Sequence, residues 1–181
     1  MSNKAPILTA SRILDSSRVA QAADDTPVTG WPTTDPFIIV FQIDEGAGPW
    51  TANYRVDWQD DTDGSGYTEL VTSGELIRGP GTVLTDGGAV TIGEKACTAT
   101  GGGGSTWQDG LELDGSSQTG SYQILDEYYT EFHVVVDPQN ADYHTYSFRL
   151  YDATDGAEIG IAAATITFAA PPNPRRVFII S

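Results

Sequence analysis

The sequence predicts an all-β protein built around a single antiparallel β-sandwich. Thr, Val, Ile, Tyr and Trp dominate its patterned stretches, and these residues favour strands. The chain contains 20 glycines and 10 prolines, which separate short stretches of alternating apolar and polar residues, as in a sandwich or a barrel. Its 181 residues allow one domain with a sizeable core plus additional segments. We divide it into an N-terminal arm at 1–34, a β-sandwich at 35–170 and a C-terminal tail at 171–181.

The arm carries apolar residues that the sandwich pattern does not need. Residues 11–23 have the pattern of a short helix, followed by Pro and Gly residues that end it. An isolated helix of this length is marginal in water, so removal of residues 1–30 should leave a folded sandwich. A leader without a fixed structure is the alternative. We expect the arm to pack mainly on another chain through four apolar residues: Ile7, Leu8, Ile13 and Leu14.

The strands of the sandwich follow in order. Residues 37–43 are apolar almost throughout, which is typical of a strand covered on both faces. Residues 53–59 alternate cleanly, with one face apolar. The turn at 86–88 indicates a hairpin between two of the further strands, which are predicted at 67–71, 82–85, 89–92, 111–113, 122–125, 129–136, 143–152 and 159–168. Side-chain parity predicts a core of Val56, Trp58, Phe132, Val134, Val136, Phe148 and Leu150.

The tail, PPNPRRVFIIS, combines a rigid spacer with an apolar end. Its prolines cannot continue a sheet and favour an extended chain. Four apolar strand formers follow two arginines and would be an aggregation hazard if exposed. We expect another subunit to bury them, at a sheet edge or in a groove. The tail residues concerned are Arg175, Arg176, Val177, Phe178, Ile179 and Ile180.

Charge is segregated along the chain. Residues 20–170 carry 24 acidic side chains against four basic ones, a net of −20. Residues 1–19 hold Lys4, Arg12 and Arg18 against Asp15, and residues 171–181 hold two arginines, so each end has a net of +2. Complementary potentials can attract the basic ends of one subunit to the acidic body of its neighbour. Arg12 and Arg18 are therefore further candidate assembly contacts.

The same charge limits the classes of partner. A net charge of −16 and a pI of about 4.1 argue against nucleic acid and against an anionic membrane surface. The sequence lacks a signal-peptide pattern and a membrane-spanning stretch, so we expect synthesis in the cytosol. The single cysteine, Cys97, excludes an intramolecular disulfide and is interpreted as a small buried residue.

Two patterns could carry metal or acid–base chemistry. The loop at 61–66, DTDGSG, resembles a calcium loop in its alternate oxygen ligands and sixth glycine. Its twelfth position is Thr72 instead of a carboxylate, so we favour a solvated hairpin loop. His133 and His144 are predicted on opposite faces of their hairpin, which argues against a joint site.

Two further groups are weighed against ordinary packing. Asp126 and Glu127 could act as acid and base in a glycosidase, but among 25 acidic residues such proximity arises by chance. We therefore predict no enzyme, no cofactor and no metal. A sugar-stacking surface is the alternative to core or interface packing for four aromatic residues: Trp31, Trp50, Trp107 and Tyr128.

Four stretches occur in order across about residues 50–170: YTELVTSGELIRGPGTVLTDGGAVTI, YTEFHVVVD, YSFRLYDATDGAEIG and ATITF. Together they resemble a recurrent immunoglobulin-like β-sandwich of tailed-bacteriophage virion proteins. The arm is not covered, and the loops at 60–66 and 97–110 are longer than in that family. The expected fold is immunoglobulin-like or jelly-roll-like. The resemblance implies no catalytic residues.

From this resemblance we expect a structural protein of a phage particle, most simply a capsid decoration (cement) protein on the outer surface of the virion. Its expected partners are the major capsid protein or another virion protein, and further copies of itself, with a trimer as one arrangement. A tail, neck or fibre component is the alternative within this class. From another class, the alternative is an adhesin-like module that binds glycans or a host surface.

Overall fold

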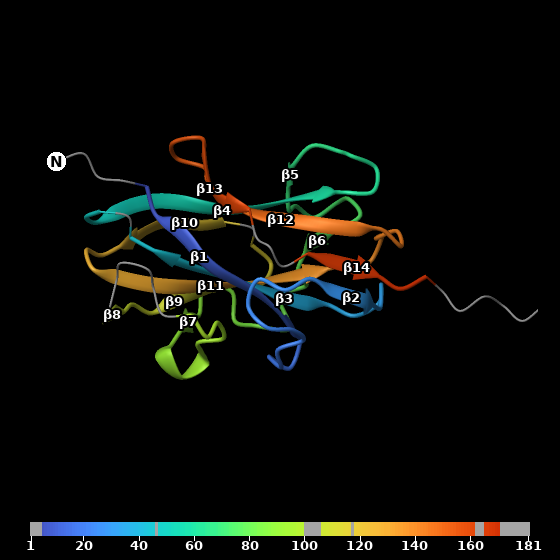
Figure 1. Ribbon diagram of the computed structural model, residues 1–181, viewed down its shortest axis with the longest axis horizontal. Coiled ribbons are helices and arrows are strands. Elements are labelled where there is room, and N and C mark those ends of the chain that lie inside the picture. Colours follow the sequence, from blue (N-terminus) through green and yellow to red (C-terminus); the bar gives the residue numbers. More distant parts are fainter. Residues whose placement is uncertain (1–4, 46, 100–105, 117, 162–164, 171–181) are drawn as a thin grey trace, which may run out of the picture.

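Two β-sheets stacked face to face make up the protein (Figure 1). The computed structural model describes residues 5–45, 47–99, 106–116, 118–161 and 165–170. The predicted all-β sandwich is confirmed. Most strand pairs are antiparallel, but β8 and β9 pair with β11 in parallel, as β2 does with β14, so both sheets are mixed.

The first sheet is organised around its longest strand, β11. One edge of β11 pairs with β3, which pairs with β1. The other edge pairs in turn with β8, β9 and β6, and β9 pairs with β7. The strands of this sheet are β1 (Ile7–Asp15), β3 (Phe37–Asp44), β6 (Ile77–Arg78), β7 (Ala89–Val90), β8 (Thr106–Trp107), β9 (Gly110–Leu113) and β11 (Tyr128–Asp137).

The second sheet is organised around β4 and β12. β4 pairs with β10 and β5, while β12 pairs with β4 on one edge and with β13 and β14 on the other. β2 extends the sheet beyond β14. The strands of this sheet are β2 (Val28–Trp31), β4 (Trp50–Asp60), β5 (Thr68–Glu69), β10 (Gln118–Ile124), β12 (Thr145–Asp152), β13 (Ala157–Ile161) and β14 (Ile166–Phe168).

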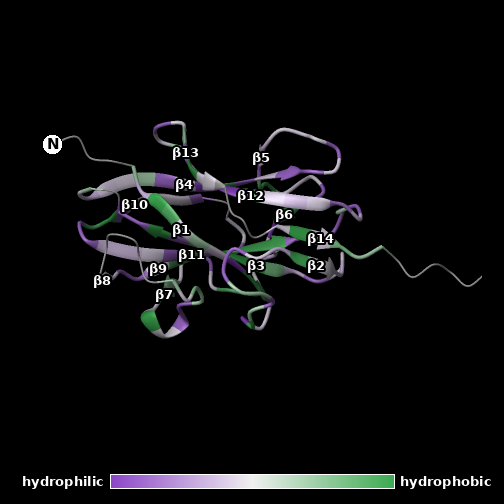
Figure 2. Ribbon diagram, in the orientation of Figure 1, coloured by the Kyte–Doolittle hydropathy of each residue, from purple (hydrophilic) through white to green (hydrophobic). Residues whose placement is uncertain are grey.

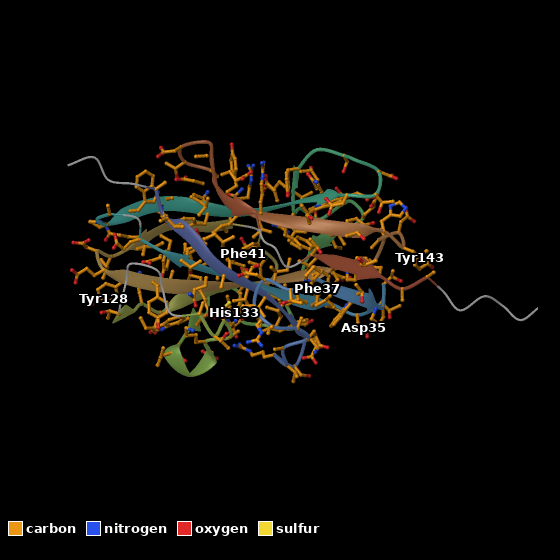
Figure 3. All side chains as sticks on the ribbon, viewed as in Figure 1. Asp35, Phe37, Phe41, Tyr128, His133 and Tyr143 are labelled. Atoms are coloured by element: carbon orange, nitrogen blue, oxygen red, sulfur yellow. The ribbon has the colours of Figure 1, made fainter. Side chains whose placement is uncertain are left out.

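The main core fills the space between the sheets. All seven core residues expected from side-chain parity lie in it and are no more than 8 % exposed. Phe37 and Phe41 project into this layer (Figure 3). The Phe37 ring meets the Phe148 ring at a centroid distance of 6.0 Å in a T-shaped arrangement, which is favourable for the aromatic quadrupoles. Hydrophobic residues accordingly colour much of β1, β3 and β14, whereas the connecting loops are largely hydrophilic (Figure 2).

β3 is buried on both faces, as its apolar sequence predicts. All eight of its residues are buried. Phe37, Ile39, Phe41 and Ile43 face the main core, whereas Ile38 and Val40 belong to a smaller apolar cluster on the opposite face. We call that opposite side the outer face of the first sheet. A long connection across this face makes the run of consecutive apolar residues possible.

The predicted separate arm is wrong. Residues 7–15 form β1 and pair with β3, so they are part of the sandwich. The expected helix at 11–23 is absent, because Ile13 packs in the main core and Leu14 in the outer cluster. Two covered faces and an open β3 edge stabilise a strand more than local helix propensity stabilises a helix. β2 also lies in this region, so the proposed boundary at residue 35 does not separate the arm from the sandwich.

Two strand predictions at 82–92 and 159–168 also need correction. β7 pairs with β9 and not with residues 82–85, because the N–H groups of Val83 and Leu84 donate to the Asp114 carboxylate. The stretch at 159–168 divides into β13 and β14, which pair with different parts of β12. The one helix among the described residues is η1 (Ile92–Glu94), so no helix in these ranges is long and apolar enough to cross a membrane.

This arrangement reverses the expected effect of truncation. Removal of residues 1–30 deletes β1 and most of β2, which exposes the edge of β3 and removes Ile13 from the main core and Leu14 from the outer cluster, so the truncated chain should not fold. Ile13→Ala should lower the free energy of unfolding by about 2–5 kcal/mol, because Ile13 is 1 % exposed in the core. Urea denaturation followed by tryptophan fluorescence measures both effects.

Val19→Ala is the matched control, because Val19 lies in the same segment but is 57 % exposed. It should change the free energy of unfolding by less than about 0.5 kcal/mol. A stable, cooperatively unfolding chain lacking residues 1–30 would contradict this account of β1.

Candidate functional site

The four apolar residues that we expected to contact another chain, Ile7, Leu8, Ile13 and Leu14, lie in different environments. Ile13 and Leu14 are 1 % and 2 % exposed within this chain, so in this fold they are not available to a partner. Leu8 packs against Gly160 of β13. Ile7 is 53 % exposed. Of the four, Ile7 therefore offers the most apolar surface to another subunit.

The two arginines of this region are engaged within the chain. Arg12 donates from Nη1 to the carbonyl oxygen of Ala96 at 2.6 Å, and the same atom lies 3.5 Å from Asp24 Oδ1. Arg18 pairs with Glu94 at 3.2 Å and also contacts the Glu112 carboxylate. The N-terminal positive charge is therefore largely neutralised by acids of the same molecule. The six tail residues at 175–180 lie outside the described residues.

The loop at 61–66, which resembles a calcium loop in sequence, is organised by the residue that precedes it. Asp60, at the end of β4, has a side chain that is 3 % exposed. Its Oδ1 accepts hydrogen bonds from the N–H groups of Thr62 and Asp63, at 2.8 and 3.2 Å. Its Oδ2 lies 2.6 Å from Nδ1 of His144. The loop is thus closed by a buried carboxylate and by a histidine from the start of the neighbouring strand.

Asp60, Asp63 and His144 together resemble a metal-ligand group, and we tested whether they fit one. Their ligand atoms lie within 4.8 Å of one another. However, two ligands of a tetrahedral zinc stand about 3.3 Å apart, whereas the Asp60–His144 distance of 2.6 Å is that of a short hydrogen bond. The other oxygen of Asp60 already accepts two N–H groups. The geometry fits a hydrogen-bonded ion pair that fixes the loop.

This pair shifts the pKa of both partners. The hydrogen bond and the charge of Asp60 raise the pKa of His144 above its ordinary value of 6.5, with the nearby charges of Asp63 and Asp142 adding to the effect. Burial opposes ionisation of Asp60, but hydrogen bonds from His144 and from the N–H groups of Asp63 and Thr62 outweigh it. The pKa of Asp60 is therefore lowered.

The two histidines do not share the predicted hairpin, because β11 and β12 belong to different sheets. His133 is fully buried on β11, with Nε2 3.0 Å from Glu131 Oε2. Its Nδ1 has no hydrogen-bond partner among the described atoms. Side-chain parity had placed His133 on the face opposite Phe132 and Val134, and that face is also covered here.

The sequence did not indicate a cluster of charged and aromatic residues on the exposed face of the second sheet. Asp57 is 1 % exposed and receives the guanidinium groups of Arg55 and Arg149. The Arg149 guanidinium lies 4.4 Å from the ring centroid of Tyr67, and Tyr151 stacks with both arginines. The hydrogen bond with Asp57 raises the pKa of Arg55. Alternation along β4 placed Arg55 and Asp57 on one face, but the cross-strand pairing with Arg149 is a tertiary property.

The remaining candidate residues do not form one site. Trp31 is nearly buried in β2, where its Nε1 donates to the carbonyl of Asp35. Trp107 lies on β8, at the opposite end of the molecule from β2 (Figure 1), and packs against Tyr129. Asp126 and Glu127 occupy the exposed turn between β10 and β11. Tyr128 and Tyr143 mark the two ends in Figure 3.

In comparisons with known proteins, no family model and no curated protein matches this chain. No pocket is found over the residues that the structure describes.

The Asp60–His144 pair predicts a measurable pH dependence. A histidine with a raised pKa stabilises the fold below its unfolded pKa of about 6.5, and this contribution is lost as pH rises through the folded pKa. The lowered pKa of Asp60 has the opposite sense, since its contribution is lost as pH falls. In an NMR titration, His144 should titrate above 6.5, and Asp60→Asn should bring it back toward that value. Asp126→Asn is the control, and an unchanged His144 pKa in Asp60→Asn would contradict the pairing.

The cluster around Asp57 predicts a contrast between two partners of the same arginine. Asp57→Asn removes a buried negative charge and one of its two acceptor oxygens, and leaves two arginines without the charge between them, so it should cost about 3–5 kcal/mol of unfolding free energy. Glu158 lies 3.3 Å from Arg149, but its side chain is 41 % exposed. Glu158→Gln should therefore cost only about 0–1 kcal/mol. Equal costs in urea denaturation would show that burial of Asp57 is not the deciding factor.

Proposed function

We propose that this chain is a non-enzymatic structural protein of a phage particle, specifically a capsid decoration protein on the outer surface of the virion. In this role it binds the major capsid protein or another virion protein, and further copies of itself. One observation carries the proposal: residues 175–180 combine two arginines with four apolar residues, next to a body with a net of −20 over residues 20–170. A segment of this composition suits binding to an acidic neighbouring subunit.

The distribution of exposed charge on the body supports this proposal. None of the four basic residues of the body is exposed, because Arg55, Arg78, Lys95 and Arg149 are all partly buried. The exposed charges are acids, most of them in the loops and turns; they include Asp25, Asp35, Asp61, Asp63, Asp86, Asp109, Asp126, Glu127, Asp142, Asp155 and, on β13, Glu158. An anionic surface steers a basic segment toward it and suppresses contact between two bodies.

Most of the N-terminal candidate contacts are engaged within this chain. Arg12 and Arg18 are paired with acids of this molecule, and Ile13 and Leu14 are buried in it. The assembly contacts that we retain in the proposal are the tail residues at 175–180, with the exposed Ile7 as an additional apolar contact.

Mass spectrometry of purified particles tests the proposal. Virions are prepared from the phage or prophage whose genome encodes the chain, and antibody labelling in electron micrographs then locates the protein. Labelling of the capsid supports the proposal, while labelling of the tail, neck or fibre keeps the virion class and changes the location. Absence from particles together with binding on a glycan array would favour the adhesin-like alternative.

The tail predicts a division of roles between its apolar and charged residues. In reconstitution with particles lacking the protein, Phe178→Asp should weaken binding by about tenfold or more, because a buried aromatic side chain contributes about 1.5–3 kcal/mol. Arg175→Ala combined with Arg176→Ala should mainly slow association and reduce its salt dependence, since exposed ion pairs contribute about 0–1 kcal/mol.

Ile92→Asp is the matched control, because Ile92 is an apolar residue of the body that is 58 % exposed. It should leave binding unchanged. The reverse ranking, with the double arginine variant weaker than Phe178→Asp, would show that the tail binds through charge.

A further inference from the structure

A long connection covers the outer face of the first sheet. We call residues 79–99 the strap; it begins after β6 and runs below the sheet in Figure 1 as the green to yellow segment that includes β7 and η1. Its buried residues Leu84 and Cys97 pack against Ile38, Val40 and Val135 of the sheet. The strap therefore completes the smaller apolar cluster.

Side-chain carboxylates hold the first part of the strap. Asp114 accepts hydrogen bonds from the N–H groups of Gly81, Val83 and Leu84, at 2.8, 2.6 and 2.8 Å. Glu112 accepts from the N–H group of Thr85 at 2.9 Å. Glu112 lies on β9 and Asp114 directly follows that strand, and both are no more than 4 % exposed. Buried N–H groups need an acceptor, and here carboxylates replace a neighbouring strand.

The last part of the strap is held in the same way. Glu131 on β11 is fully buried and accepts from the N–H groups of Ala96 and Cys97, at 2.8 and 2.9 Å. Asp24 accepts from the N–H groups of Thr98 and Ala99, at 2.7 and 3.1 Å. Four carboxylates thus bind eight backbone N–H groups of the strap.

The strap contributes no residue to the main core. Leu84 and Cys97, its buried apolar residues in the outer cluster, pack on the opposite face of the first sheet. A unit with a small apolar contact of its own can open locally, at a lower free energy than global unfolding. Besides the carboxylates, backbone hydrogen bonds of Gly79 with Val135 and of residues 87–90 with β9 attach the strap to the sheet, together with contacts from Arg12 and Arg18.

The charged groups around these carboxylates set the direction of the pH effect. Arg12 donates to the carbonyl oxygen of Ala96 and Lys95 to that of Ala99, while Arg18 lies between Glu94 and Glu112. These cations keep their charge in acid, so the charge that changes is that of the carboxylate acceptors. Asp86 also accepts a hydrogen bond, from the N–H group of Asp114.

The pKa of Asp24 gives the sign of the pH effect. Burial opposes ionisation of Asp24, but its hydrogen bonds with Thr98 and Ala99 and the charge of Arg12 hold its pKa below the ordinary value of 3.8. Its contribution to the closed strap is therefore lost as pH falls. His133 lies beside Glu131, with its Nε2 3.0 Å from Oε2 of that carboxylate.

We propose that the strap is an acid-released cover. Protonation of Asp24, Glu112, Asp114 and Glu131 frees residues 79–99 from the sheet while the sandwich stays folded, and exposes the apolar outer face around Ile38, Val40 and Val135. At neutral pH the same carboxylates keep that face covered.

Cys97 supplies the test, because it is the one cysteine of the chain and its side chain is buried between the strap and the sheet. Its reaction rate with dithiodipyridine, a reagent that detects thiols in acid, is measured from pH 7 to pH 2.5, because the pKa of Asp24 lies below 3.8. Each rate is divided by the rate in urea-unfolded protein at the same pH, which removes the titration of the thiol. We expect this ratio to rise by about tenfold or more as pH falls, while tryptophan fluorescence from the main core stays native.

Substitutions distinguish release of the strap from general unfolding of the protein in acid. Asp114→Asn and Glu131→Gln should raise the Cys97 ratio at pH 7 by about tenfold or more, because each weakens two or more hydrogen bonds to a charged acceptor. Asp126→Asn is the control, since Asp126 is exposed and remote from the strap. The pH series on the unsubstituted chain keeps the test valid if a variant fails to fold.

Two results would overturn the proposal. In the first, Cys97 becomes reactive only at the pH where tryptophan fluorescence reports global unfolding. In the second, Asp126→Asn raises the ratio as much as the two strap substitutions do.

Discussion

Burial of the first sheet on both faces is the constraint from which most of the structure follows. β3 is apolar from Phe37 to Phe41, so neither face of this stretch can be left in water. One face packs against the second sheet, and the other needs a separate cover, which the strap supplies. β1 pairs with the edge of β3 and adds Ala10 and Leu14 to the covered outer face. The N-terminal segment is therefore part of the sandwich and is not free to act as an arm.

The strap needs hydrogen-bond acceptors for its backbone N–H groups, and acidic side chains supply them. The strap follows an irregular path over an apolar face, so many of its N–H groups have no neighbouring strand. Asp114 and Glu131 provide acceptors from inside the sheet, where a charged acceptor forms stronger hydrogen bonds than a neutral one. A part of the negative charge of this chain thus has a structural use. The net charge of −16 is not a surface property alone.

The acidic residues of this molecule therefore fall into two groups, buried and exposed, with different roles. Buried acids organise the strap, the loop after β4 and the Arg55–Arg149 cluster, and each is matched by N–H groups or cations of the same chain. Other acids are exposed to solvent and give the body its anionic surface. Only the second group is available to steer a basic segment of another subunit, on which the proposed role in a particle depends.

Strand alternation and turn composition were sufficient to predict the β-sandwich, and side-chain parity correctly placed Val56, Phe132 and Leu150 in its core. They were sufficient because alternation depends only on neighbours along the chain, and because the second face of β3 could be inferred from its unbroken apolar run. The path of residues 7–15 and 79–99 could not be inferred. Their positions depend on which distant surface is left uncovered, and on acceptors such as Glu131 that lie far away in sequence. The same reason explains why Asp57 and Asp60 were not recognised: the partners that define their sites, Arg149 and His144, are brought to them only when β12 pairs with β4.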